Sequence, residues 1–265
     1  MGDKGLLCVS FGTSHAQTRE KTIDAIESLL AERFPERKFY SAWSSKVIRK
    51  KVAAERGEHH DSVDEALERV MADGVSDLVV VTTFLMPGWE MGRVRDAVAS
   101  FADRGTCKVS FAEPLLASED DVRALVDAVV REFSQLGADE ALLLMGHGSA
   151  QGPNDIYYKI QDQLRESSDG RFFLATVEGQ PTLDDVLPTV LERNASCVTL
   201  APLMIVAGDH ANNDLAGDDE DSWQNILRGQ GVQTRAALKG LGEYPGVREL
   251  ICAHAREAAE RAERA

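Results

Sequence analysis

The sequence predicts an α/β protein made of two similar doubly wound halves, each with a parallel sheet covered by helices on both faces. Short apolar runs alternate with segments of helical periodicity along the whole chain, an arrangement typical of parallel sheets with crossover helices. The segment 6–14 resembles 142–149, and the segment 77–88 resembles 196–204. A length of 265 residues is sufficient for two modest domains.

The first half is expected to contain four strands, each a short apolar run of the kind that is buried on both faces of a sheet. They are expected at residues 6–10, 38–42, 77–84 and 107–111. Apolar residues three and four positions apart predict helices between these strands. Those helices are expected at 18–34, 62–72 and 94–101.

The second half repeats this pattern, with strands expected at 141–145, 171–177, 197–203 and 232–236. Its helices are expected at 120–136 and 182–193, and a last helix at 247–265. The predicted domains are residues 1–125 and residues 126–265, with the C-terminal helix (245–265) packing on the first half. A cleft between two such domains is a favoured place for a ligand.

The formal net charge is −15, from 29 basic and 44 acidic residues. This charge disfavours nucleic acid or an anionic membrane as a partner, because both bind basic surfaces. One basic stretch, Lys46-Val47-Ile48-Arg49-Lys50-Lys51, leaves two interpretations open. It is either a solvated helix face or a patch that binds an anionic small molecule.

The sequence also predicts a cytoplasmic location. No apolar run approaches the roughly 20 residues that span a bilayer, and the first apolar run, residues 6–11, is too short for a signal-peptide core. The four cysteines, at positions 8, 107, 197 and 252, form no CxxC pair. We expect them to be free and structural, as a reducing compartment favours.

Three polar side chains follow successive predicted strands of the second half. His147 lies between two glycines after one apolar run, Glu178 ends the next run, and His210 follows the third. Intervals of 31 and 32 residues separate them, which is about the length of one strand–helix unit. Because parallel strands end at the same edge of a sheet, the three side chains are expected to converge. Two imidazoles and a carboxylate suit cobalt, zinc, nickel or iron.

Other polar residues are less specific. Glu90 is expected to assist the metal or accept a proton, or else only to stabilise a helix N-terminus. His59 and His60 are expected at the surface, and His254 at the surface or in helix packing. His15 is expected to cap a helix or to face solvent, although it could reach the cleft. The acidic run 217–221 lacks the ligand spacing of an EF-hand. We expect it to be a solvated loop that caps a helix starting near Ser222.

An apolar, flat-faced group of side chains occurs in the first half. It consists of Phe11, Leu85, Met86 and Trp89. Such a group suits contact with a large π-system, although each of these residues taken singly is more often part of a core.

Several motifs share one resemblance. They are Val9-Ser10-Phe11-Gly12-Thr13-Ser14, Met145-Gly146-His147-Gly148, Val177-Glu178, Gly240-Leu241-Gly242-Glu243-Tyr244-Pro245, and above all the stretch 202–214 followed by 218–223. These motifs resemble those of the anaerobic cobalt chelatases of cobalamin biosynthesis, class II chelatases that are similar in fold to ferrochelatase. The resemblance covers nearly the whole chain.

The resemblance implies two flavodoxin-like halves facing a central cleft, and ATP-independent insertion of Co(II) into sirohydrochlorin. By motif, the metal ligands would be His147, Glu178 and His210, and the catalytic groups His147, Glu178 and Glu90. Phe11 would stand in the first half where His147 stands in the second. The tetrapyrrole would be bound by Ser10, Phe11, Gly12, Thr13, Met86, Trp89, Lys46 and Arg49.

Alternatives remain open at this point. A chelatase for iron or nickel acting on the same tetrapyrrole, as in sirohaem formation, would use the same ligand types, since ligand chemistry does not separate these metals. A non-enzymatic metal or haem carrier would bind without accelerating insertion. An α/β hydrolase is disfavoured because no GxSxG sequence occurs. Homo-oligomer formation is left open.

Overall fold

The computed structural model describes residues 3–150 and 154–264. The chain forms two compact units, one of residues up to Ser118 together with those from Arg248 onward, and one of Glu119–Val247. The boundary expected near residue 125 falls within helix α6 (Glu119–Glu132), with which the second unit begins.

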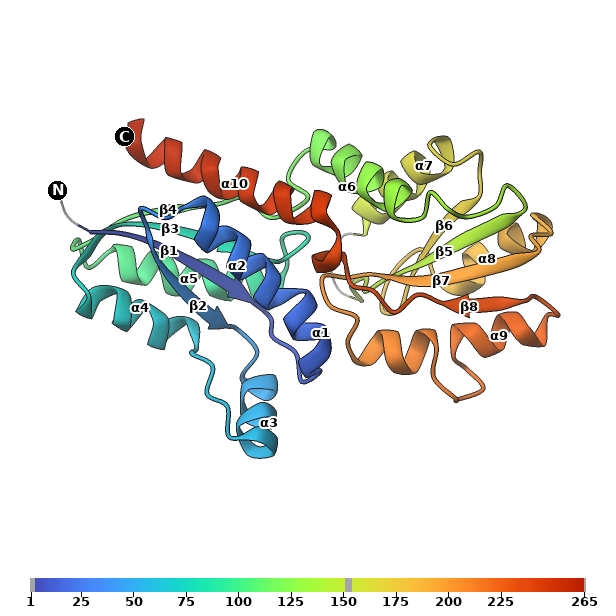
Figure 1. Cartoon of the computed structure of the whole chain (residues 1–265), viewed down its shortest axis with the longest axis horizontal. Helices are drawn as coiled ribbons and strands as arrows, with labels where there is room; N and C mark the ends of the chain where they lie inside the picture. Colours follow the sequence, from blue (N-terminus) through green and yellow to red (C-terminus); the bar gives the residue numbers. More distant parts are fainter. Residues whose placement is uncertain (1–2, 151–153, 265) are drawn as a thin grey trace. The chain divides into compact units, whose positions relative to one another are not determined.

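Each unit contains a four-stranded parallel sheet (Figure 1). The first sheet has the order β2-β1-β3-β4, with β1 (Asp3–Ser10), β2 (Lys38–Trp43), β3 (Val75–Thr82) and β4 (Lys108–Phe111). The second has the order β6-β5-β7-β8, with β5 (Glu140–Gly146), β6 (Phe172–Thr176), β7 (Cys197–Leu203) and β8 (Thr234–Ala236). All eight expected strands are present, and the same order occurs twice, so the predicted α/β class and internal repeat are confirmed.

The helices of the first unit are α1 (Ala16–Lys21), α2 (Ile23–Arg33), α3 (Lys46–Arg56), α4 (Val63–Ala72), α5 (Trp89–Ala102) and most of α10 (Pro245–Arg264). The single helix predicted over 18–34 is interrupted at Thr22, which has φ −115° and ψ −82°. The Thr22 hydroxyl donates to the Thr18 carbonyl at 2.6 Å. A threonine side chain bonded to the preceding turn competes with regular helix geometry.

The second unit has α6, α7 (Asp155–Glu166), α8 (Leu183–Glu192), α9 (Trp223–Gly229), a π-helical turn η1 (Ala211–Leu215) and a 3₁₀ turn η2 (Leu241–Glu243). Helix α7 and the turn η1 were not expected from the sequence. Helix α7 lies along the edge strand β6, where Gln161 accepts from the Leu174 amide at 2.6 Å and donates to the Phe172 carbonyl. A polar residue on its buried face weakens the apolar periodicity by which a helix is found.

Each unit has its own apolar core. In the first, β1 to β3 pack against α4 and α5 through residues that include Leu7, Val9, Leu67 and Val98. In the second, β5 to β7 pack against α8 and α9 through residues that include Met145, Phe173, Val186 and Leu227. Successive residues of β1 and β5 are buried, as expected for strands covered on both faces.

All four cysteines are free, as the sequence predicts. Within the described parts of the chain, no helix is both long enough and apolar enough to cross a membrane.

Candidate metal centre

His147 directly follows Gly146, the last residue of the strand β5. This strand pairs with β6 on one side and β7 on the other, so its end lies in the middle of the sheet edge. The loop after β6 is tied to this end, because the Glu178 amide donates to the His147 carbonyl at 2.8 Å. The backbone therefore holds His147 and Glu178 side by side.

Glycines make this close approach possible. Gly148 has φ +77°, and a Cβ atom there would lie 2.6 Å from the Gly179 amide nitrogen. At Gly146, a Cβ would lie 2.5 Å from the Tyr157 ring. The Tyr157 hydroxyl accepts from the Gly148 amide at 3.0 Å. The loop thus depends on both the backbone freedom and the small volume of glycine.

His210 comes from the segment that follows β7, directly before the turn η1. Ala211 and Leu215 of this turn are fully buried and anchor it on the core. The Asn212 side chain donates to the Gly208 carbonyl at 2.7 Å. His210 is thereby presented from a short, anchored helical segment.

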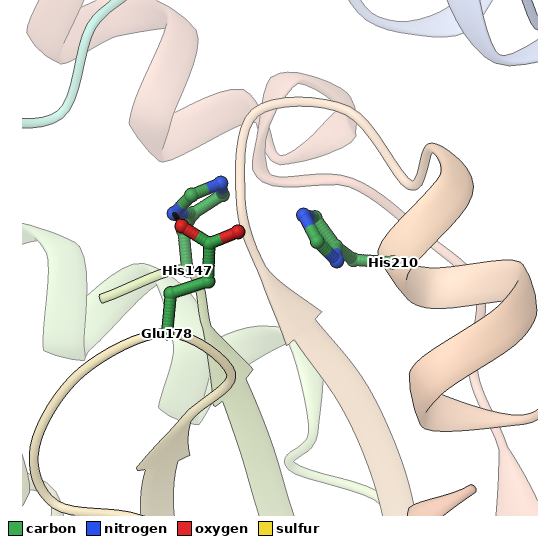
Figure 2. Close-up of side chains that lie close together, drawn as sticks. All are labelled: His147, Glu178 and His210. Carbon is green, nitrogen blue, oxygen red and sulfur yellow. Dashed lines mark ion pairs between the residues drawn. The ribbon is translucent and has the colours of Figure 1, made fainter. Parts of the chain in front are cut away.

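The three predicted ligands lie together at the carboxyl ends of β5, β6 and β7. Figure 2 shows their side chains pointing toward one another. The ring centroids of His147 and His210 are 4.9 Å apart with an interplanar angle of 89°, and His147 Nδ1 is 3.9 Å from Glu178 Oε2. One potential ligand atom from each residue lies within 4.8 Å of the other two. Two donors on one ion lie up to about 4.2 Å apart, since each is about 2.1 Å from it, so small rotations would complete a site.

This group is open to incoming molecules. The exposed fractions of the side chains are 49% for His147, 51% for Glu178 and 33% for His210. Both imidazoles use Nδ1 for a hydrogen bond, with the Gly148 carbonyl at 2.9 Å and with Asp214 Oδ2 at 2.7 Å. Because both partners accept hydrogen bonds, the neutral form of each imidazole has its hydrogen on Nδ1 and a lone pair on Nε2 that can bind a cation.

Sequence reasoning did not single out Asp214. It follows His210 by four residues, the spacing at which side chains on one helical face meet. A signal was therefore present, but it needed the knowledge that this segment is helical.

Among the described residues, a second group with metal-ligand chemistry is His59, Asp61 and Glu65. Here the carboxylates have other partners. Asp61 forms an ion pair with Arg69, and Glu65 Oε2 accepts from both the amide and the hydroxyl of Ser62 at 2.7 Å. The latter contacts complete a capping box at the start of α4, so this group is explained as a helix cap.

The other histidines vary in their surroundings. His59 is exposed, as predicted. The surface position expected for His60 is wrong: its side chain is mostly buried and its ring stacks on that of Trp43, with 3.5 Å between the ring centroids. Burial lowers the pKa of His60. His254 is buried in α10, which matches the expected role in helix packing. His15 is the residue before α1 and is partly exposed.

The predicted tetrapyrrole-binding residues belong to the first unit and differ in exposure. Phe11 is half-exposed, whereas Ser10 and Thr13 are buried. Gly12 has φ +94°, and a Cβ there would lie 2.7 Å from the Trp43 ring. Ser10, Gly12 and Thr13 thus pack the loop, and the direct substrate contacts predicted for them stay predictions.

The remaining predicted residues lie on α3 and near the start of α5. Trp89 is 77% exposed, and the Arg93 guanidinium lies 4.9 Å from its ring. Glu90 is 3.6 Å from Arg93, and Met86 is partly buried. Lys46 is exposed, but Arg49 is mostly buried and lies 3.7 Å from Glu65, so its charge is partly offset within the protein.

The acidic run after η1 is a loop, as predicted. Its residues Asp218, Asp219 and Glu220 are exposed, and the Ser222 hydroxyl accepts from the Asn225 amide at 3.3 Å. Ser222 therefore caps α9, which begins at Trp223.

The sequence matches one family model along almost its full length. Residues 4–260 match the model described as cobalt chelatase (CbiK). The sirohydrochlorin cobaltochelatase of Salmonella typhimurium is 32% identical over 255 residues, which cover 96% of each protein. The sirohydrochlorin cobaltochelatase CbiKC of Nitratidesulfovibrio vulgaris is 31% identical over 256 residues, covering 96% of this chain and 90% of that protein.

Solved chelatase structures share the fold. The structure of SirB from Bacillus subtilis with Fe³⁺ has a TM-score of 0.69 at 14% identity, covering 98% of this chain and 97% of that chain. SirB from Bacillus subtilis subspecies spizizenii in complex with cobalt has a TM-score of 0.68 over the same shares, also at 14% identity. At identities this low, the TM-scores establish similarity of fold alone.

Proposed function

The chain belongs to the cobalt chelatase (CbiK) family, and we propose that it inserts Co(II) into sirohydrochlorin, without ATP, in anaerobic cobalamin biosynthesis. The observation that carries this proposal is the convergence of His147, Glu178 and His210 at the ends of three adjacent strands. Relatives that are 31–32% identical over nearly their full length carry the name of this activity.

In this proposal, Co(II) is a substrate held by His147, Glu178 and His210. The imidazole nitrogens replace water on the ion, and the Glu178 carboxylate offsets part of its charge. The group is open to solvent, so the ion can enter and leave. An open coordination sphere is required, because the ion must pass to four pyrrole nitrogens.

Insertion also removes two protons from pyrrole nitrogens. His147 and Glu178 are proposed acceptors once the ion has left them for the macrocycle, because a lone pair that binds the metal cannot hold a proton. Glu90 is a proposed acceptor from the first unit. A base must come within hydrogen-bond reach of the proton that it removes. The proposed tetrapyrrole contacts are Phe11, Met86 and Trp89 with the π-system, and Lys46 with its carboxylates.

The metal is proposed to be cobalt on the basis of family membership. Iron or nickel insertion is the alternative, because imidazole and carboxylate ligands accept all three ions and availability decides among them. A cytoplasmic location likewise stays a prediction from the sequence.

The test is an anaerobic absorbance assay with sirohydrochlorin and Co²⁺, Fe²⁺ or Ni²⁺ offered separately, with spontaneous metalation subtracted. His147→Ala and His210→Ala should each abolish insertion while circular dichroism stays unchanged, since polar surface residues seldom carry stability. His59→Ala, from the other histidine–carboxylate group, is the matched control and should retain full activity. Near-normal rates in both ligand variants would refute the site, and binding without acceleration would indicate a carrier.

A further inference from the structure

Among the described residues of the candidate site, His210 and Asp214 form a closer side-chain contact than His147 and Glu178 do. Their Nδ1 and Oδ2 atoms are 2.7 Å apart, and both side chains are partly exposed. This distance lies at the short end of the ordinary range for N–H···O hydrogen bonds. The contact uses Nδ1 and leaves Nε2 for another partner.

We infer that Asp214 is a positioning residue, which orients His210 so that its Nε2 faces His147 and Glu178. This inference rests on the proposed function and names a residue that supports it. A carboxylate accepts hydrogen bonds, so it holds the hydrogen on Nδ1 and leaves the Nε2 lone pair free. Histidine ligands in metal sites commonly donate their second nitrogen to such a partner, which fixes the tautomer and the ring orientation.

The turn η1 makes this arrangement firm. Its buried residues Ala211 and Leu215 face the core, and its exposed residue Asp214 meets the His210 ring. The Gly217 amide donates to the Asn213 carbonyl at 2.9 Å, so the end of the turn is closed by the backbone. π-Helical turns are rare in proteins as a whole, and those that occur are often found at functional sites.

The two histidines are supported differently. His147 has a neutral acceptor, the Gly148 carbonyl, whereas His210 has a carboxylate. With Glu178, Asp214 brings a second negative charge to the neighbourhood of a divalent ion. A hydrogen bond to a carboxylate also makes an imidazole a stronger donor, so His210 should be the firmer of the two ligands.

The test compares Co²⁺ binding by Asp214→Ala, Asp214→Asn and the wild type, measured by calorimetry without tetrapyrrole. Asp214→Ala should weaken binding roughly 10- to 100-fold and raise the KM for Co²⁺, with the KM for sirohydrochlorin unchanged. Asp214→Asn should lose less, because its amide oxygen still accepts from Nδ1. Asp218→Ala removes the same charge from the exposed acidic loop and should bind Co²⁺ as the wild type does.

A double variant separates the inference from the proposed function. If Asp214 acts through His210, then His210→Ala/Asp214→Ala should bind Co²⁺ no more weakly than His210→Ala alone. Wild-type affinity in Asp214→Ala, beside a loss in His210→Ala, would overturn the inference and leave the metal site standing. Unchanged affinity in His210→Ala would refute the proposed site itself. Equal losses in Asp214→Asn and Asp214→Ala would overturn positioning, because they would show that the negative charge of Asp214 supports binding and its hydrogen bond does not.

Discussion

Position 148 accepts only glycine, because any side chain there would collide with a neighbouring loop. A Cβ atom at Gly148 would meet the backbone of Gly179 at 2.6 Å, on top of a φ of +77°. Gly170 has a similar φ of +71° but open space around it. Substitution of the two glycines therefore distinguishes the energetic cost of backbone strain, which both positions share, from the cost of a steric clash, which occurs only at Gly148.

We expect Gly170→Ala to lower the free energy of unfolding by about 1–2 kcal/mol, the cost of left-handed backbone. Gly148→Ala should lower it by more than that and also weaken Co²⁺ binding, since the clash pushes apart the loops of His147 and Glu178. Denaturant unfolding and calorimetry measure both effects. Equal destabilisation by the two substitutions would contradict the close packing at Gly148.

Glu27 on α2 has an ionisable carboxyl group that is largely buried. Burial raises its pKa from the ordinary 4.5 to about 7, although the Ser41 hydroxyl donates to it at 2.5 Å. A raised carboxyl pKa means that the folded state holds its proton more tightly than the unfolded state does. The associated stability is present below pH 4.5 and is lost as pH rises through about 7.

Glu27→Gln should therefore match the wild type in acid but exceed it in free energy of unfolding by about 3 kcal/mol at about pH 9. Glu32→Gln, at an exposed position of the same helix, is the control and should follow the wild type. Urea unfolding across this pH range provides the measurement. If the difference in free energy of unfolding between Glu27→Gln and the wild type is the same at all pH values, the pKa of Glu27 is the same in the folded and unfolded states, and this prediction is wrong.

At the scale of elements, the sequence predicts what depends on periodicity and misses what depends on individual contacts. The eight strands are apolar runs, and their order follows from the alternation with helices. The break at Thr22 depends on one hydroxyl–carbonyl bond, and the turn η1 has five residues, too few to show a period. Helix α7 buries Gln161, which an apolar pattern does not mark.

The candidate site divides in the same way. His147, Glu178 and His210 could be predicted because each follows a strand, and parallel strands end at one edge. Asp214 could not, because its contact with His210 needs the helical geometry of η1. The burial of Ser10 and Thr13 was also missed, since a motif does not show which of its side chains point inward.

Asn225 on α9 binds the preceding loop through hydrogen bonds of its side chain. Its side-chain amide donates to the carbonyls of Gly217, Asp218 and Asp219, at 3.4, 3.2 and 2.9 Å. Asn225→Ala should lower the free energy of unfolding by about 1–3 kcal/mol and speed hydrogen exchange at 217–222. Exposed Asn213 provides the control, since Asn213→Ala should leave exchange in this loop unchanged. Unchanged exchange in Asn225→Ala would show that the loop does not depend on these bonds.

At the scale of the whole molecule, the net charge of −15 acts on the two proposed substrates in opposite senses. It attracts a divalent cation and repels a polycarboxylate, and salt screens both effects over distances of about 10 Å. Raising the ionic strength from about 10 mM to about 150 mM should increase the KM for Co²⁺ roughly threefold to tenfold and decrease the KM for sirohydrochlorin. Steady-state kinetics at constant pH measure both. Shifts of the two constants in the same direction would contradict this electrostatic account.

The repeated sheet order has an evolutionary consequence. In both sheets the first strand of the repeat is flanked on each side by a neighbour, and the residue after it is Phe11 in one copy and His147 in the other. Duplication of one ancestral unit would account for such a pair, with the three proposed metal ligands present in the second copy alone. In the proposed function, the second copy supplies the metal ligands and the first supplies the contacts with the macrocycle. The proposal therefore lets macrocycle preference change through substitutions in the first copy alone, while the three ligands stay the same.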